Sequence, residues 1–64
     1  MEVLVNGETK QVSSNTLQSL LKELAFEGDF AVAVNSEFVP RSLYAEQAIQ
    51  SGDQIDVLSP IAGG

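Results

Sequence analysis

The sequence contains neither cysteine nor histidine. The absence of cysteine excludes disulfide bonds, cysteine-ligated metal sites and thiol nucleophiles. The absence of histidine removes the commonest general base and a common metal ligand. A chain of 64 residues also forms one small domain, with little room for a substrate pocket beside a complete catalytic apparatus. These features favour a protein that acts with partners over a free-standing enzyme.

Positive charge and long apolar runs are also scarce. Three Lys and Arg residues stand against nine Asp and Glu, which gives a formal net charge of -6. Nucleic-acid phosphates require a basic surface, so we expect no nucleic-acid partner. The acid excess suits a protein partner with a basic face, and it serves solubility equally well. There is no membrane-spanning run, and Met1–Leu4 does not resemble a signal peptide, so we expect a cytoplasmic protein with no membrane contact.

The N-terminal residues predict a β-hairpin. Met1 to Asn6 alternates in the period of a half-buried strand, with Val3 and Val5 on one face. Asn6-Gly7 is the strongest short hairpin signal, because both residues tolerate the positive φ of a type I′ turn. The returning segment from Glu8 to Val12 is polar except at its last residue, and we expect it at the edge of a sheet.

A helix is predicted next. Asn15 or Thr16 can cap its N-terminus, and Gln18 stands in the capping-box position relative to Asn15. Gly28 is the expected stop. Apolar residues at helical spacing form one stripe, which we interpret as core: Leu17, Leu20, Leu21 and Leu24.

The rest of the chain alternates short strands and turns. Residues 30–34 form a continuous apolar run, typical of a central strand covered on both sides, with Val32 and Val34 facing the helix. A short strand is expected at 37–39 and a last one at 54–58, the latter following the Ser51–Asp53 turn. Between them, residues 42–49 are expected to be irregular or to hold a helical turn. Four of these residues are predicted to pack: Leu43, Tyr44, Ala48 and Ile49.

One helix covers only one face of such a sheet. The strand phases place three apolar side chains on the uncovered face: Leu4, Phe38 and Leu58. Single exposed apolar residues are normal and need no explanation. If the three are contiguous, they mark a docking site for a partner.

The chain ends Ile61-Ala62-Gly63-Gly64. We expect residues 1–58 to be globular and 59–64 to form a mobile tail, disordered from Ile61 onward. Six extended residues reach about 20 Å, and glycine lets a backbone thread a narrow channel. A carboxylate becomes an acyl donor only after activation, ordinarily adenylation by ATP. The sequence has no phosphate-binding loop, so a partner would bind the nucleotide. A terminus without a role is the alternative.

Over its whole length the sequence resembles the ThiS family of sulfur carrier proteins in thiamin biosynthesis, which belongs to the β-grasp, ubiquitin-like group. The resemblance lies in Val3-Leu4-Val5-Asn6, the helix segment 16–21, Ala33-Val34-Asn35, Val39-Pro40-Arg41 and Gly52-Asp53-Gln54-Ile55, together with the terminal Ala62-Gly63-Gly64. Tyr44 stands where the family has Trp, and Ser19 where it often has Glu.

The resemblance implies an α+β fold of the β-grasp type. Its mixed sheet has four to five strands, with the first and last parallel at the centre and one main helix on one face. It implies a single sulfur-carrier domain over 1–64. Apart from the resemblance, we expect a monomer when the protein is free, with no bound metal or cofactor. Leu4, Phe38 and Leu58 would dock a partner.

The resemblance also implies a reaction at the tail. A ThiF-like adenylyltransferase would use ATP to activate the Gly64 carboxylate, with Gly63 as the slender stalk. A sulfur-transfer protein would convert the adenylate to a thiocarboxylate, and a ThiG-like thiazole synthase would take the sulfur.

Three other functions fit the same residues. The small subunit of molybdopterin synthase uses the same thiocarboxylate, although that family is usually longer between helix and third strand. A ubiquitin-like modifier would end on a lysine. A plain β-grasp interaction domain would have no tail chemistry. Arg41 is either a contact or, as we slightly favour, a surface charge.

Overall fold

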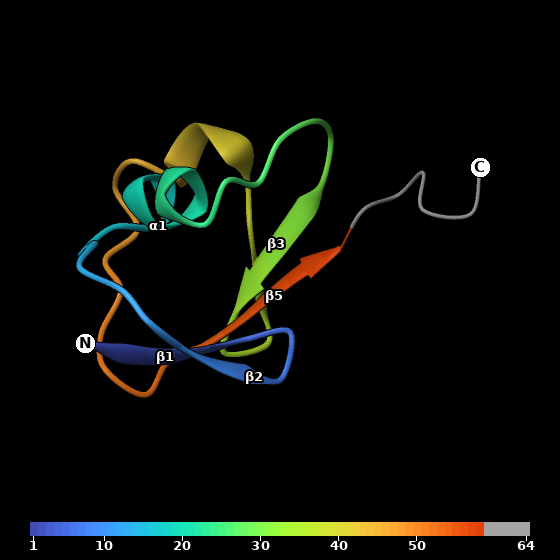
Figure 1. Ribbon diagram of the computed structural model, residues 1–64. Helices are drawn as coiled ribbons and strands as arrows, with labels where there is room; N and C mark the ends of the chain where they lie inside the picture. The colour runs from blue at the N-terminus through green and yellow to red at the C-terminus, as the bar shows by residue number, and fades with distance from the viewer. Residues whose placement is uncertain (59–64) are drawn as a thin grey trace.

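The computed structural model describes residues 1–58, and five strands in it form one mixed sheet (Figure 1). The strand order is β2-β1-β5-β3-β4. β1 and β5 are parallel, and the other neighbours are antiparallel. The elements are β1 Glu2–Val5, β2 Glu8–Gln11, α1 Leu17–Glu23, β3 Ala31–Val34, β4 Glu37–Val39, the 3-10 turn η1 Arg41–Leu43, and β5 Gln54–Leu58. The predicted first-and-last parallel pair is confirmed. The predicted mobile tail, 59–64, lies outside the described residues.

The hairpin forms where the sequence predicts it. Asn6 and Gly7 have φ values of 52° and 83°, which is the left-handed backbone that a type I′ turn requires. β2 is exposed along its whole length and lies at the sheet edge, as expected. The strand ends at Gln11 rather than at Val12. Val12 is buried and donates its backbone N–H to the carbonyl of Met1.

The helix begins at Leu17 and is capped by Thr16, whose hydroxyl accepts a hydrogen bond from the backbone N–H of Ser19 at 3.2 Å. Thr16 is one of the two predicted caps, and this prediction is confirmed. The alternative, a capping box of Asn15 with Gln18, is wrong, because the cap falls one residue later. The predicted stop at Gly28 is also wrong. Ala25 takes the left-handed conformation, with φ of 63°.

Two hydrogen bonds close the last turn of α1. They run from Ala25 to the carbonyl of Lys22 and from Phe26 to the carbonyl of Leu21. This is the Schellman pattern, which usually has glycine at the reversal. Phe26, two residues past the C-cap Leu24, packs partly against the core and helps to hold this reversal in the absence of a glycine.

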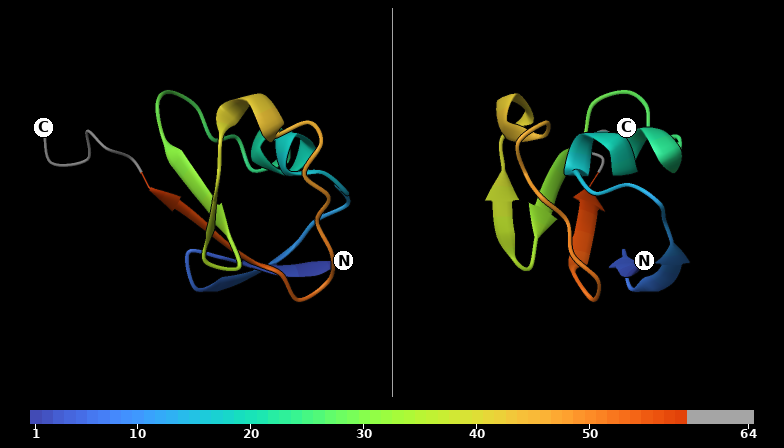
Figure 2. Two further views of the ribbon diagram at one scale, coloured as in Figure 1. Left: turned by 180° about the vertical axis from the view of Figure 1, so that it is seen from behind. Right: turned by 90° about the vertical axis from the view of Figure 1, so that its left-hand side faces the viewer.

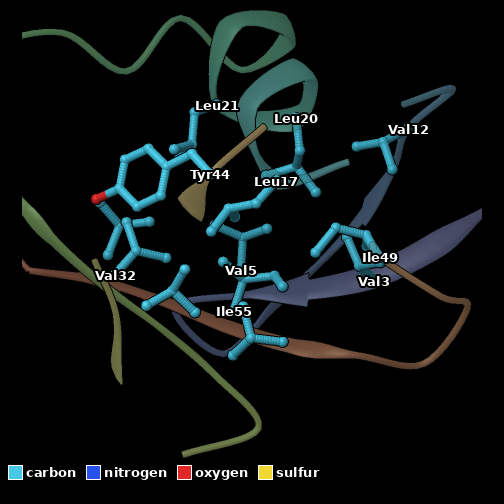
Figure 3. Packing of buried hydrophobic residues seen from close by; sticks show 13 residues of the cluster. Val3, Val5, Val12, Leu17, Leu20, Leu21, Val32, Tyr44, Ile49 and Ile55 are labelled. Atoms are coloured by element: carbon cyan, nitrogen blue, oxygen red, sulfur yellow. The ribbon is translucent and has the colours of Figure 1, made fainter. Parts of the chain in front are cut away.

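The core lies between α1 and the facing side of the sheet (Figures 2 and 3). The predicted inward phases are confirmed in β1, β3, β4 and β5. The buried residues are Val3, Val5, Val12, Leu17, Leu20, Leu21, Val32, Val34, Val39, Tyr44, Ile49, Ile55 and Val57, with Leu24, Phe26 and Phe30 partly buried against them.

Two packing predictions are wrong. Leu43 and Ala48 are exposed, whereas Tyr44 and Ile49 pack as expected. The segment is irregular, so no strand or helix period fixes which of its side chains turn inward. The predicted cover on both sides of β3 is wrong. α1 covers the face that carries Val32 and Val34, whereas Ala31 and Ala33 on the opposite face are only half-buried.

Glu23 holds the segment before α1 in place. Its carboxylate accepts hydrogen bonds from the backbone amides of Ser13 and Ser14, at 3.1 Å, and from the Ser14 hydroxyl, at 2.6 Å. The hydroxyl of Ser14, followed by the amide of Ser13, holds the pKa of the Glu23 carboxyl below its ordinary value of 4.5. Glu23 thus ties the last turn of α1 to the segment that joins the helix to the hairpin.

This contact makes stability depend on pH. Because the folded-state pKa of Glu23 is depressed, its contribution is complete above the unfolded-state value of 4.5 and is lost as pH falls through the lower folded-state pKa. We expect Glu23→Gln to lower the free energy of unfolding at pH 7 and to weaken its decline below pH 4.5. Urea unfolding at several pH values measures both. Glu46→Gln is the control, since Glu46 is exposed and its carboxylate accepts no hydrogen bond within residues 1–58; an equal effect there would contradict the assignment.

Candidate functional site

The uncovered face of the sheet carries the three residues predicted for docking. Leu4, Phe38 and Leu58 are 37%, 67% and 66% exposed. In each of the three strands a neighbouring valine is buried on the opposite side, against α1. The prediction that these side chains lie on the uncovered face is therefore confirmed, although exposure alone does not make a docking site.

The strand register brings two of the three together. Leu58 pairs with Ala31, and Phe38 pairs with Ala33. The large side chains of Leu58 on β5 and Phe38 on β4 thus lie on either side of two alanines on β3, the strand between them. We call these four residues, Ala31, Ala33, Phe38 and Leu58, the outer apolar patch.

Leu4 lies apart from the outer apolar patch. It pairs with Gln54 on β5, four residues before Leu58. At the rise of a β-strand this separation is roughly 13 Å. Gln54 and Asp56, both in phase with Leu58, lie between them. The three residues are therefore not one contiguous cluster.

The uncovered face carries acidic residues beside its apolar ones. Glu2 is in phase with Leu4, and Asp56 with Leu58. Lys10, by contrast, pairs with the inward-facing Val3, on the helix side of the sheet. An apolar patch with acidic neighbours suits a partner whose own apolar surface has a basic rim.

Asn6 holds the end of β5 that adjoins this patch. Its backbone N–H donates to the carbonyl of Ile55 at 2.9 Å, continuing the parallel ladder. Its side-chain Oδ1 then accepts a hydrogen bond from the N–H of Val57 at 2.8 Å. The side chain replaces the next ladder bond, because the β1 backbone turns away at Asn6-Gly7. One residue therefore makes the hairpin turn and fixes the strand just before Leu58.

Substitution of Asn6 separates these two roles. Glycine keeps the left-handed turn but removes the acceptor, so Asn6→Gly should leave the part-buried Val57 N–H unpaired. We expect a loss of about 1 kcal/mol in the free energy of unfolding and faster hydrogen exchange at that amide. Asn6→Asp keeps both an acceptor and tolerance of positive φ. Equal protection of Val57 in the two variants would show that the side-chain bond has no effect.

Arg41 lies on the surface, with its side chain 69% exposed and 3.5 Å from the Asp29 carboxylate. This agrees with the surface-charge interpretation. The sequence interpretation missed a nearby aromatic cluster, in which the Phe30 ring lies 6.0 Å from Phe26 and 6.4 Å from Tyr44 between centroids. All four aromatic residues of the chain fall between positions 26 and 44, and three of them form this cluster; that clustering in the sequence could have indicated it.

The predicted tail residues Ile61, Ala62, Gly63 and Gly64 lie outside the described residues. The last described residue, Leu58, belongs to the outer apolar patch. Within residues 1–58 there is no group of three metal-ligating side chains. In the same range, no helix is long and apolar enough to cross a membrane.

Comparison with known proteins decides to which family the chain belongs. The family model for ThiS matches residues 3–64. The chain belongs to the ThiS family. It is 36% identical over 66 aligned positions to the sulfur carrier protein ThiS of Escherichia coli, and the alignment covers the whole of both chains. This ThiS-family chain is also 38% identical to part of a thiazole synthase of Paramagnetospirillum magneticum, and spans 20% of the length of that protein.

Solved structures agree with the ThiS assignment. The crystal structure of a ThiS thiamine biosynthesis protein from Geobacter metallireducens matches all of this chain and is itself matched along its whole length. Its TM-score is 0.86, at 25% sequence identity. A solution structure of a thiamine biosynthesis protein from the same organism gives 0.79, with 88% of that chain covered. The β-grasp fold expected from the sequence is confirmed.

Proposed function

We propose that this ThiS-family protein carries sulfur for the thiazole ring of thiamin, as a thiocarboxylate on Gly64. The observation that carries the proposal is the match to a sulfur carrier protein along the full length of both chains, through the terminal Gly-Gly. The position of the outer apolar patch supports it, because Leu58 adjoins the last six residues. A partner docked on the patch would stand beside the start of the reacting segment.

The chemistry follows from the reactivity of a carboxylate. A ThiF-like adenylyltransferase binds ATP and joins AMP to the Gly64 carboxylate, releasing pyrophosphate. A sulfur-transfer protein then supplies sulfur, which replaces the AMP-bearing oxygen and releases AMP. The small residues Gly63 and Gly64 let the segment from Ser59 onward, up to about 20 Å long, enter the partner's active site. The protein is consumed and regenerated as a cosubstrate; it is not itself the enzyme.

The sulfur acceptor in this proposal is a thiazole synthase. The relative from Paramagnetospirillum magneticum supports it, because a thiazole synthase there contains a segment 38% identical to this chain. Such an arrangement would keep carrier and acceptor together. No observation favours the molybdopterin, protein-modifier or plain interaction functions. We place the protein in the cytoplasm, as a monomer when free.

Docking on the outer apolar patch predicts a sensitive position at Leu58. Leu58→Asp places a charge in the apolar contact and should weaken binding to the adenylyltransferase roughly ten- to hundred-fold. Leu43→Asp is the matched control, because Leu43 is 44% exposed on η1, which lies on the helix side of the sheet (Figure 2). Calorimetric titration of each variant measures the difference. Equal losses at both positions would rule out the patch as the docking surface.

Genetic complementation tests the proposed function as a whole. An Escherichia coli strain that lacks its own ThiS should grow without added thiamin when it expresses this protein. A strain that lacks the small subunit of molybdopterin synthase should not be rescued. Rescue of the second strain alone would reverse the assignment of pathway.

A further inference from the structure

Two turns beside the central strand β5 are each built around an asparagine (Figure 1). Asn6 follows β1 and Asn35 follows β3, with positive φ values of 52° and 51°. In both turns the side-chain Oδ1 accepts a hydrogen bond from a backbone N–H of β5. Asn6 accepts from Val57 at 2.8 Å, and Asn35 accepts from Gln54 at 3.0 Å. Each asparagine thus continues the ladder of β5 where a neighbouring strand ends.

The two asparagine side chains are not held equally. Asn35 also donates its Nδ2 to the Asp53 carboxylate at 3.1 Å, so both ends of its amide group are fixed. Within residues 1–58, the amide group of Asn6 is held through its oxygen alone. Asn6 is followed by Gly7, where an added β-carbon would meet no atom within 4 Å, so water reaches this turn freely. The dipeptide at Asn6 is therefore the more open of the two.

An asparagine followed by glycine can lose its amide group. The backbone nitrogen of Gly7 attacks Cγ of Asn6 and closes a five-membered succinimide ring. The amide nitrogen leaves as ammonia, together with the proton of the Gly7 N–H. Glycine has no side chain that obstructs the attack. Water then opens the ring. Cleavage between Cγ and the Gly7 nitrogen gives an aspartate, and cleavage between the α-carbonyl carbon and that nitrogen gives an isoaspartate.

The closed turn opposes this reaction. The ring forms only when Cβ of Asn6 and the nitrogen of Gly7 are nearly eclipsed about the Cα–C bond. A type I′ turn sets ψ of its first central residue at about 30°, which keeps these two atoms on nearly opposite sides of that bond. The hydrogen bond from Val57 also directs the side chain toward β5. Deamidation therefore requires an open turn, and the edge strand β2, exposed along its whole length, permits such opening.

We propose that Asn6 is a modification site, which deamidates when the β1–β2 turn opens and whose isoaspartate product prevents the turn from closing again. The isoaspartate backbone is longer by one carbon, which a two-residue hairpin turn does not accommodate. Its free carboxylate stems directly from Cα and is too short to replace Oδ1 as the acceptor for Val57. The end of β5 then loses this bond just before Leu58. The inference does not rest on the proposed function.

Mass spectrometry of peptides from protein kept at mildly alkaline pH tests the proposal. We expect Asn6 to deamidate at least about ten-fold more slowly in the folded protein than in guanidinium chloride, because only the open turn reacts. Ser36→Gly supplies a matched control, a second Asn-Gly turn in which the amide of Asn35 is fixed at both ends. In the unfolded chain the two sites should react at similar rates. In the folded variant Asn35 should react about five-fold more slowly than Asn6, the effect of one further hydrogen bond.

Hydrogen exchange at the Val57 amide measures the consequence. The isoaspartate form, separated by chromatography, should exchange this amide about five-fold faster than the unmodified protein. Asn6→Asp reproduces the other product and should keep the protection, because its side chain still reaches the amide.

Three results would overturn the proposal. One is an equal rate of deamidation at Asn6 in the folded and unfolded protein, since the turn would then give no protection. Another is complete reaction of the unfolded chain while the folded protein stays unmodified, since the turn would then not open. The third is unchanged exchange at Val57 in the isoaspartate form.

Discussion

Removal of Gly64 is expected to abolish formation of the thiocarboxylate while leaving the fold intact. Every element of the sheet and helix lies within residues 1–58, so the domain should unfold at the same urea concentration as the full chain. On the proposed function, the shortened chain presents its carboxylate one residue too early for the adenylyltransferase. Gly63→Val tests the narrow passage separately. Its branched side chain should lower the rate of adenylation by about a hundred-fold, the cost of misplacing a reacting group.

The matched control for Gly63→Val is Ala45→Val. Ala45 is exposed in the segment after η1, so the same kind of side chain is added far from the reacting end. We expect normal adenylation there, measured as ATP-dependent release of pyrophosphate. Full activity of the chain without Gly64 would place the reactive group elsewhere.

The second large effect is expected in the core. Leu20 lies on α1 and is fully buried between the helix and the sheet (Figure 3). Truncation of such a leucine to alanine costs about 2–5 kcal/mol, through lost burial and the cavity that remains. A domain of this size has only about 3–10 kcal/mol of total stability. Leu20→Ala should therefore leave a large fraction of the protein unfolded at 37 °C, as measured by urea unfolding and circular dichroism.

Leu43→Ala provides the comparison for Leu20→Ala. It removes the same atoms from a side chain that is 44% exposed, and we expect a loss below about 0.5 kcal/mol. If the two variants were equally stable, the packing of α1 on the sheet would be wrong.

The sequence predicted those parts of the fold that local rules determine. Asn6-Gly7 specifies its turn by backbone conformation alone, and the helix stripe and strand alternation assign inward faces correctly. The end of α1 could not be predicted in the same way. It reverses at Ala25, which is no usual helix terminator, and the reversal depends partly on the packing of Phe26. Exposure of Leu43 and Ala48 was missed because an irregular segment has no period.

The candidate site, too, has features that local sequence rules predict and features that only the folded chain determines. Strand phase correctly put Leu4, Phe38 and Leu58 on the uncovered face. Whether these three side chains form one cluster depends on strand order and register. The register places Phe38 and Leu58 on either side of two alanines of β3 and leaves Leu4 apart. The aromatic cluster was missed for a related reason. Its rings come from segments that only the folded chain brings together.

The most direct test of the account is the intact mass of the protein recovered from cells that also make its activating enzyme. We predict a gain equal to the exchange of one oxygen for sulfur, assigned to Gly64 by fragmentation. An unmodified mass, with no adenylate formed when ATP and the enzyme are added to the purified protein, would contradict the sulfur-carrier function.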